Sequence, residues 1–75
     1  MQTAMTVQIK AEMGALGWKQ PDLAAAAGLH TSTLHRYLSG ARDIPLPVLA
    51  EISRALGLPL TELMARGQHR QDSND

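Results

Sequence analysis

Side chains capable of chemistry gather in one short polar segment, from Thr31 to Arg36. Thr31 and Ser32 carry hydroxyls, His35 carries an imidazole and Arg36 a guanidinium. Hydroxyls beside an imidazole raise the question of a hydrolase, but such a site also needs a buried acid that orients the base and a cleft that holds a substrate. A chain this small is expected to offer neither. We therefore predict that the protein is not an enzyme and interpret the segment as a hydrogen-bonding surface.

The histidines do not predict a metal centre. His30 and His35 are five residues apart, a spacing that does not place two imidazoles on one helix face, and no further His lies near them. The chain has no Cys, so thiolate metal sites and disulfides are excluded. The sequence therefore indicates no metal, no cofactor and no small-molecule ligand.

Two short helical patterns position the polar segment, one on each side of Ala27-Gly28-Leu29-His30. The first begins near Gln20, with Pro21 in its first turn, where a missing N–H costs nothing. The second runs over about residues 31–38. Two helices joined by a short turn containing Gly form a helix-turn-helix unit, whose second helix usually lies in the major groove of DNA.

The second of these helices has one apolar side and one polar side. Leu34, Tyr37 and Leu38 recur at i, i+3 and i+4, which predicts that they face inward. The residues left facing outward are Thr31, Ser32, His35 and Arg36. Arg is well suited to reading a base pair, because its guanidinium can donate two hydrogen bonds to O6 and N7 of guanine.

Apolar spacing predicts three further helices, over about residues 4–16, 47–56 and 60–65. No strand pattern appears, so the sequence predicts one all-α domain of five helices over residues 1–67, with residues 1–3 loose. The inner faces are expected to hold Met5, Ile9, Met13 and Leu16, then Val48, Leu49, Ile52, Ala55 and Leu56, then Leu60 and Leu63, with Met64 as a further candidate. Residues 68–75 are polar, lack apolar anchors and are expected to form a disordered tail.

The charge balance of the chain is neutral. Seven Lys and Arg match seven Asp and Glu, which counts against strong nucleic-acid binding because phosphate neutralisation dominates non-specific affinity. What matters more is where the cations lie. No apolar run is long enough to span a membrane and no signal-peptide pattern opens the chain, so we expect a cytoplasmic, nucleoid-associated protein without membrane contacts.

The pattern across four of these helices resembles the Xre/Cro/cI family of helix-turn-helix domains, which are lambda repressor-like, over about residues 5–64. The residues that carry the resemblance are Gln20, Leu23-Ala24, Ala27-Gly28-Leu29, Thr33-Leu34, Arg36, Gly40, Leu49, Ile52 and Ala55-Leu56-Gly57. The resemblance implies a five-helix fold in which Gln20 binds a DNA phosphate and Thr31, Ser32 and Arg36 meet base edges. It also implies that the loop carrying Arg42 follows the phosphate backbone.

Three further residues are predicted to contact DNA, apart from those that the resemblance implies. His35 shares the outward face and is interpreted as a base contact. Lys19 precedes the helix that starts at Gln20, where a cation opposes the helix dipole unless phosphate lies nearby. Lys10 is taken as a further phosphate contact.

The sequence departs from the family pattern at two kinds of position. Lys19 and His30 stand where Ser, Thr or Asn would cap a helix, and Lys cannot accept the free N–H bonds; Thr31 is an alternative cap for the second helix. Met13 and Leu38 occupy positions where many family members have an ion pair. We expect an apolar contact there, a replacement that can be neutral or stabilising.

The function predicted from the sequence is a sequence-specific double-stranded DNA-binding transcriptional regulator, a small repressor of phage, plasmid or prophage type. A module of this size contacts few base pairs, so a homodimer on a palindromic operator is expected, with Leu58, Leu60 and Met64 as candidates for the dimer surface. One alternative is the antitoxin of a toxin–antitoxin pair, which would co-purify with a small partner. The other is a helical protein-interaction module, which would not bind DNA even at low salt.

Overall fold

A computed structural model of the chain describes the backbone of residues 2–73 and the side chains of residues 4–70. This part of the chain contains helices and no strand. The helices are α1 (Gln2–Leu16), α2 (Gln20–Ala27), α3 (Thr31–Leu38), α4 (Leu46–Ala55) and α5 (Leu60–Ser73). The predicted all-α, five-helix fold is therefore confirmed.

Every helix contributes one completely buried aliphatic side chain to a common core. These side chains are Ile9, Leu23, Leu34, Ile52 and Leu63, each 0% exposed. The remaining buried hydrophobic residues, including Met13 and Leu38, surround them. Truncation of such a side chain to Ala typically costs about 2–5 kcal/mol, so the whole fold depends on this cluster.

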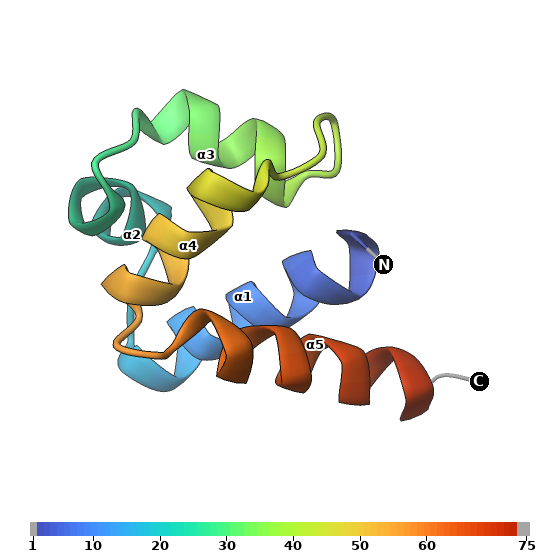
Figure 1. Cartoon of the computed structure of the whole chain (residues 1–75). Helices are drawn as coiled ribbons and strands as arrows, with labels where there is room; N and C mark the ends of the chain where they lie inside the picture. The colour runs from blue at the N-terminus through green and yellow to red at the C-terminus, as the bar shows by residue number, and fades with distance from the viewer. Residues whose placement is uncertain (1, 74–75) are drawn as a thin grey trace.

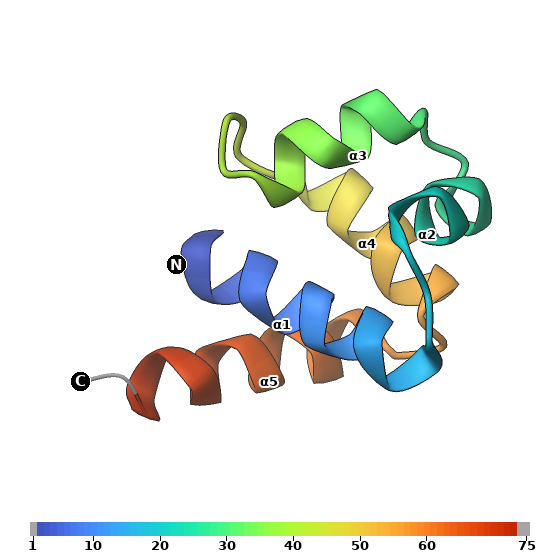
Figure 2. The ribbon, with the colours of Figure 1, turned by 180° about the vertical axis from the view of Figure 1, so that it is seen from behind.

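The helices form a layered arrangement with α3 at one side of the molecule and α5 at the other (Figure 1). The view from behind shows α4 and α1 between them (Figure 2). α2 packs against α3 and α4, while α1 packs against α3 and runs antiparallel to α5 along much of its length. The arrangement leaves the outer side of α3 uncovered by any other helix.

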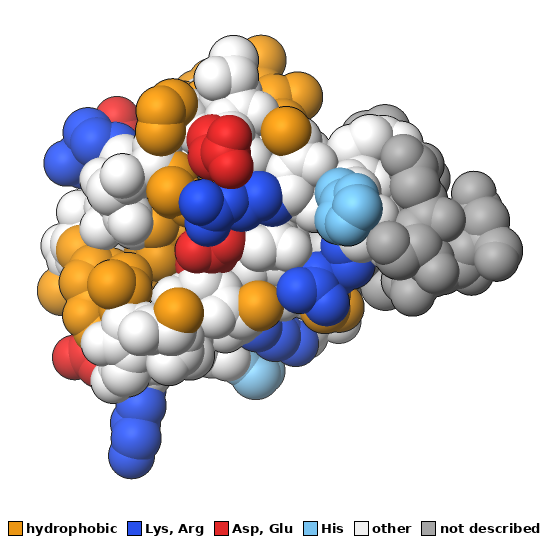
Figure 3. All heavy atoms as spheres, turned by 90° about the horizontal axis from the view of Figure 1, so that it is seen from below, with side chains coloured by type: hydrophobic (Ala, Val, Ile, Leu, Met, Phe, Trp, Pro, Cys, Tyr) orange, Lys and Arg blue, Asp and Glu red, His pale blue; other side chains and the backbone are white. Residues whose placement is uncertain are grey.

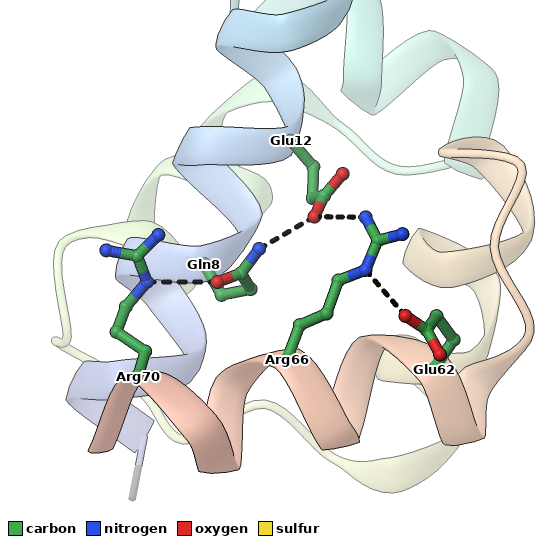
Figure 4. Close-up of polar contacts among 5 residues, drawn as sticks. All are labelled: Gln8, Glu12, Glu62, Arg66 and Arg70. Atoms are coloured by element: carbon green, nitrogen blue, oxygen red, sulfur yellow. Dashed lines mark hydrogen bonds and ion pairs between the residues drawn. The ribbon is translucent and has the colours of Figure 1, made fainter. Parts of the chain in front are cut away.

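A row of polar side chains joins α1 to α5 (Figure 4). Nε of Arg70 donates to Oε1 of Gln8 (2.9 Å), and Nε2 of Gln8 donates to Oε2 of Glu12 (2.7 Å). The same Glu12 oxygen accepts from Nη1 of Arg66 (2.8 Å), whose Nε donates to Oε1 of Glu62 (2.8 Å). The Glu12 side chain is only 15% exposed, so this row is a partly buried contact rather than a solvated pair.

The two helices also approach closely at Gly67. A Cβ atom at this position would lie 2.9 Å from Cε of Met5, so the absence of a side chain lets α5 rest directly on the first turns of α1. The α5 residues that make these contacts with α1 are Arg66, Gly67 and Arg70. All three lie beyond residue 65, the expected end of the fifth helix.

The expected ends of the chain were wrong in two places. α1 begins at Gln2 although residues 1–3 were expected to be loose, and α5 continues to Ser73. Residues 68–73, expected to be part of a disordered tail, are helical; residues 74–75 lie outside the described part. The physical reason is that α1 offers polar partners, so a stretch without apolar anchors can still dock. The division of the chain at residue 67 falls inside a continuous helix.

Two residues considered for the inner faces are exposed. Met64 on α5 is 43% exposed. Leu16 is 49% exposed, because α1 ends there and Gly17 turns the chain toward α2 with a positive φ of 72°. The adjacent Trp18 is partly buried and packs against the core.

The polar row predicts a specific loss of stability in acid. The hydrogen bond from Arg66 holds the pKa of the Glu12 carboxyl below its ordinary value of 4.5, helped by Gln8 and opposed by burial. A lowered folded-state pKa stabilises the native state above the unfolded-state pKa, and that contribution disappears as the pH falls through the folded-state value. Glu12→Gln should therefore lower the melting temperature at pH 7 and lower it less at pH 3.

Glu51→Gln is the matched control, because Glu51 pairs with Arg54 in an i,i+3 contact in which both side chains are more than half exposed. Such pairs contribute little, so this variant should melt like the wild type at both pH values. An equal destabilisation by Glu12→Gln at pH 7 and pH 3 would show that the charge of Glu12 is irrelevant.

Candidate nucleic-acid interface

The turn between α2 and α3 is fixed by Gly28. Its φ and ψ angles of 72° and 30° are left-handed, a conformation that glycine adopts at no steric cost. The backbone N–H groups of Gly28 and Leu29 donate to the carbonyls of Ala25 (3.3 Å) and Ala24 (2.8 Å), which ends α2. Leu29 then packs against the core, so α3 starts at a defined angle to α2.

The start of α2 is stabilised by a residue that the sequence analysis overlooked. Lys19 is the N-cap, as predicted, and its side chain makes no capping hydrogen bond. Instead, its backbone N–H donates to Oδ2 of Asp22 (2.8 Å), which is half of a capping box. The carboxylate also lies in the first turn, where it complements the helix dipole. The spacing of three residues was the signal that could have found Asp22.

The start of α3 has no such support. His30 is the N-cap and its side chain makes no capping hydrogen bond. Its carbonyl accepts the first bond of the helix, from the Leu34 N–H (3.0 Å). The alternative cap at Thr31 is therefore not used, and Thr31 is the first helical residue.

The two sides of α3 are divided as predicted. Leu34, Tyr37 and Leu38 are buried. The candidate base-contacting residues Thr31, Ser32, His35 and Arg36 are all exposed on the outer side. The structure thus brings these four side chains together on one uncovered surface.

Gln20 joins this surface from α2. Nδ1 of His35 lies 3.3 Å from Oε1 of Gln20. Gln20 is half-buried and Lys19 beside it is exposed, so the first turn of α2 lies at one edge of the α3 surface.

The segment after α3 folds back over its last turn. The Arg36 carbonyl oxygen accepts hydrogen bonds from the Ser39 hydroxyl (3.1 Å) and from the backbone N–H groups of Ala41 (3.0 Å) and Arg42 (3.3 Å). The guanidinium carbon of Arg42 consequently lies 5.9 Å from the centre of the Tyr37 ring, within the range of a cation–π contact. Arg42 is therefore held beside the end of α3.

Lys10 and Arg42 line one hollow, although they are far apart in the sequence. The hollow has a volume of about 370 Å³ and lies between the first half of α1 and the segment that follows α3. Its lining is Thr6, Val7, Lys10, Tyr37, Leu38, Ser39, Gly40, Arg42 and Asp43. The two candidate phosphate contacts thus meet at the end of α3 that is remote from Gln20.

The cations of the described part fall into two groups. Arg54 donates to Glu51, Arg66 donates to Glu12 and Glu62, and Arg70 donates to Gln8. Arg70 makes no ion pair but is held by Gln8, whereas Lys10, Lys19, Arg36 and Arg42 make neither an ion pair nor a side-chain hydrogen bond in the described part of the chain. All of the latter group are candidate DNA contacts. The acids near them are Asp22, which bonds to the Lys19 backbone N–H, and Asp43, which lines the hollow with Lys10 and Arg42. Basic side chains therefore outnumber acidic ones around α3 although the total charge is neutral.

The face opposite α3 has a different character. Figure 3 shows it from below, with basic and acidic side chains next to one another and hydrophobic side chains between them. Of the candidate dimer residues near this side, Leu58 and Leu60 pack against the core, and Met64 is 43% exposed. Two of the three candidate dimer residues therefore pack within the chain itself, and none of the three lies on the α3 surface.

Two other features bear on the kind of site. In the described part of the chain, no group of three or more His, Cys, Asp or Glu side chains is arranged to hold a metal ion. None of the helices described is long and apolar enough to cross a membrane.

Comparison with known proteins adds two findings. A family model described as Helix-turn-helix (HTH_3) matches residues 9–63, from the middle of α1 to the first turn of α5. The fold is similar to that of the clp gene regulator ClgR from C. glutamicum, with a TM-score of 0.80, 18% identity and coverage of 91% of this chain and 88% of that one. No curated protein matches.

The conformation of Gly28 predicts the effect of adding a methyl group to it. A Cβ atom there would have no neighbour within 4 Å, so Gly28→Ala adds backbone strain and no clash. We expect a loss of about 1–2 kcal/mol in the free energy of unfolding, measured by urea denaturation.

Gly14→Ala is the matched control. Gly14 lies inside α1 and also has open space around it, so the same methyl group should stabilise the protein by about 0.5–1 kcal/mol. If Gly28→Ala stabilises the protein as Gly14→Ala does, the left-handed turn at Gly28 is not what orients α3.

Proposed function

The chain belongs to the helix-turn-helix family, in its Xre/Cro/cI type, and from this premise we propose that it is a sequence-specific double-stranded DNA-binding transcriptional regulator. The observation that carries the proposal is the partition of charge. The four cations without a side-chain partner, Lys10, Lys19, Arg36 and Arg42, lie on and around the outer side of α3, which no other helix covers. Phosphate neutralisation is the dominant source of affinity for DNA, and these cations are available for it.

In this proposal α3 enters the major groove. Arg36 reads a guanine through its guanidinium, and Thr31 and Ser32 bond to base edges or touch a thymine methyl. All three side chains are exposed on the same side of the helix. The opposite side of the helix is fixed in place, because Leu34, Tyr37 and Leu38 are buried in the core.

Phosphate contacts flank this helix on both sides. Gln20 and Lys19 lie at the first turn of α2, where backbone N–H groups and the helix dipole favour an anion. Lys10 and Arg42 line the hollow at the other end of α3. Contacts on both sides would set the register of α3 on the duplex without reading sequence themselves.

Repression by a homodimer is the finer part of the proposal. A single α3 contacts few base pairs, and a two-fold dimer would read a palindromic operator with half-sites about one helical turn apart. The exposed Met64, with Leu58 and Leu60 beside it in sequence, remains the candidate for the dimer surface. The fold shared with a gene regulator supports the regulatory role, and we propose a small repressor of phage, plasmid or prophage type that acts in the cytoplasm.

Substitutions on α3 and α2 should separate base reading from backbone binding. After an operator is selected from random duplexes, Arg36→Ala should weaken binding by about 1–3 kcal/mol and relax the preference at one base pair. Gln20→Ala should weaken binding to all sequences alike. Arg54→Ala is the control, because Arg54 pairs with Glu51 on α4; wild-type binding by Arg36→Ala and Gln20→Ala would refute the groove assignment.

The hollow gives a separate prediction about salt. Lys10→Ala and Arg42→Ala should each lower the affinity for every duplex and reduce the slope of log K against log salt concentration by about one. The slope comes from fluorescence anisotropy titrations at several salt concentrations, again with Arg54→Ala as the control. An unchanged slope in both variants would remove Lys10 and Arg42 from the interface.

A further inference from the structure

A single side-chain hydrogen bond joins the two helices of the helix-turn-helix unit in the described part of the chain. It connects Gln20, the first residue of α2, with His35, in the middle of α3. Both side chains lie on the proposed DNA surface, and the contact spans 15 positions of sequence. No helical periodicity requires this contact, which depends on how α2 and α3 pack.

The chemistry of the contact fixes its direction. The atom of Gln20 that faces the ring is the amide oxygen Oε1, which only accepts hydrogen bonds, so Nδ1 of His35 must carry the proton. The amide oxygen is then occupied by the ring. The two N–H groups of Gln20 Nε2 are left on the other side of the amide, free to donate to an anion at the start of α2.

From this geometry we propose that His35 is a positioning residue for Gln20 and that DNA binding takes up a proton at Nε2 of His35. The inference rests on the proposed function. With Nδ1 protonated, a neutral imidazole presents a bare lone pair at Nε2, which repels a phosphate or base acceptor. A proton on Nε2 turns it into a second donor, so a bound duplex favours the imidazolium form.

Charged groups lie on α3 and on the two helices that pack against it. On the packed elements these are Lys10 and Glu12 of α1, Lys19 and Asp22 next to α2, and Arg36 of α3. The acid Glu12 bonds to Arg66, and Asp22 bonds to the Lys19 backbone N–H. None of these groups forms an ion pair with His35. In the described part of the chain no acid is therefore paired with the ring, and a DNA phosphate is the anion that would pair with its protonated form.

The first test uses the free protein and needs no DNA. Nitrogen chemical shifts of the imidazole at pH 8 should show the Nδ1–H tautomer of His35 in the wild type. In Gln20→Ala the ring should change to the Nε2–H tautomer, while His30 should be the same in both proteins. An Nε2–H tautomer in the wild type, or no change in Gln20→Ala, overturns the positioning role.

The second test measures DNA affinity between pH 5.5 and 8 for matched variants. Wild-type affinity should rise as the pH falls. The slope of log K against pH should correspond to uptake of no more than one proton per binding site. His35→Gln can still donate to Gln20 but does not titrate, so it should keep most of the affinity at pH 8 and lose the pH dependence. His35→Leu should lose both.

A double-mutant cycle separates this inference from the proposed function. The loss of DNA affinity caused by Gln20→Ala should be about threefold larger in the wild-type background than in the His35→Leu background. The reason is that the effects of substitutions at coupled residues are not additive. If the wild type binds DNA and the two losses are equal, the positioning role is overturned and the DNA-binding function stands. If the wild type binds no duplex at low salt, the proposed function fails and the inference fails with it.

Discussion

The burial of one aliphatic side chain from each helix is the constraint on which the rest of the structure depends. α2 and α3 have eight residues each, and helices of that length are marginal in water by themselves. They exist here because Leu23 and Leu34 are inserted completely into a core shared with Ile9, Ile52 and Leu63. Because that insertion fixes which side of α3 is inward, it also fixes which side chains are presented outward.

Charge is then distributed by contact rather than by composition. Glu12, Glu51 and Glu62 neutralise arginines on α4 and α5. The basic side chains around α3 have no ion-pair partners, and they outnumber the nearby acids Asp22 and Asp43, so a neutral chain carries one surface with an excess of basic groups. An interface of this kind combines a field that attracts phosphates with polar groups that contact base edges.

The contact between α1 and α5 shows how a polar segment can be ordered without apolar anchors. Arg66 and Arg70 reach side chains 54 and 62 positions earlier in the chain, and Gly67 lets the helices approach closely. Each bond replaces hydration of a partly buried group, so the row stabilises α5 only while α1 is already in place. It is a consequence of the core rather than an independent source of folding energy.

The sequence by itself determined the helices that carry the site, the turn at Gly28 and the inward and outward sides of α3. These features follow from spacing over a few residues and from the conformational freedom of glycine, both of which are local. Only the tertiary structure decided the length of α5, the meeting of Lys10 with Arg42, the contact of Gln20 with His35 and the pairing of Glu12. Each depends on residues distant in the chain, and periodicity along one helix does not specify which side chains of another helix it will meet.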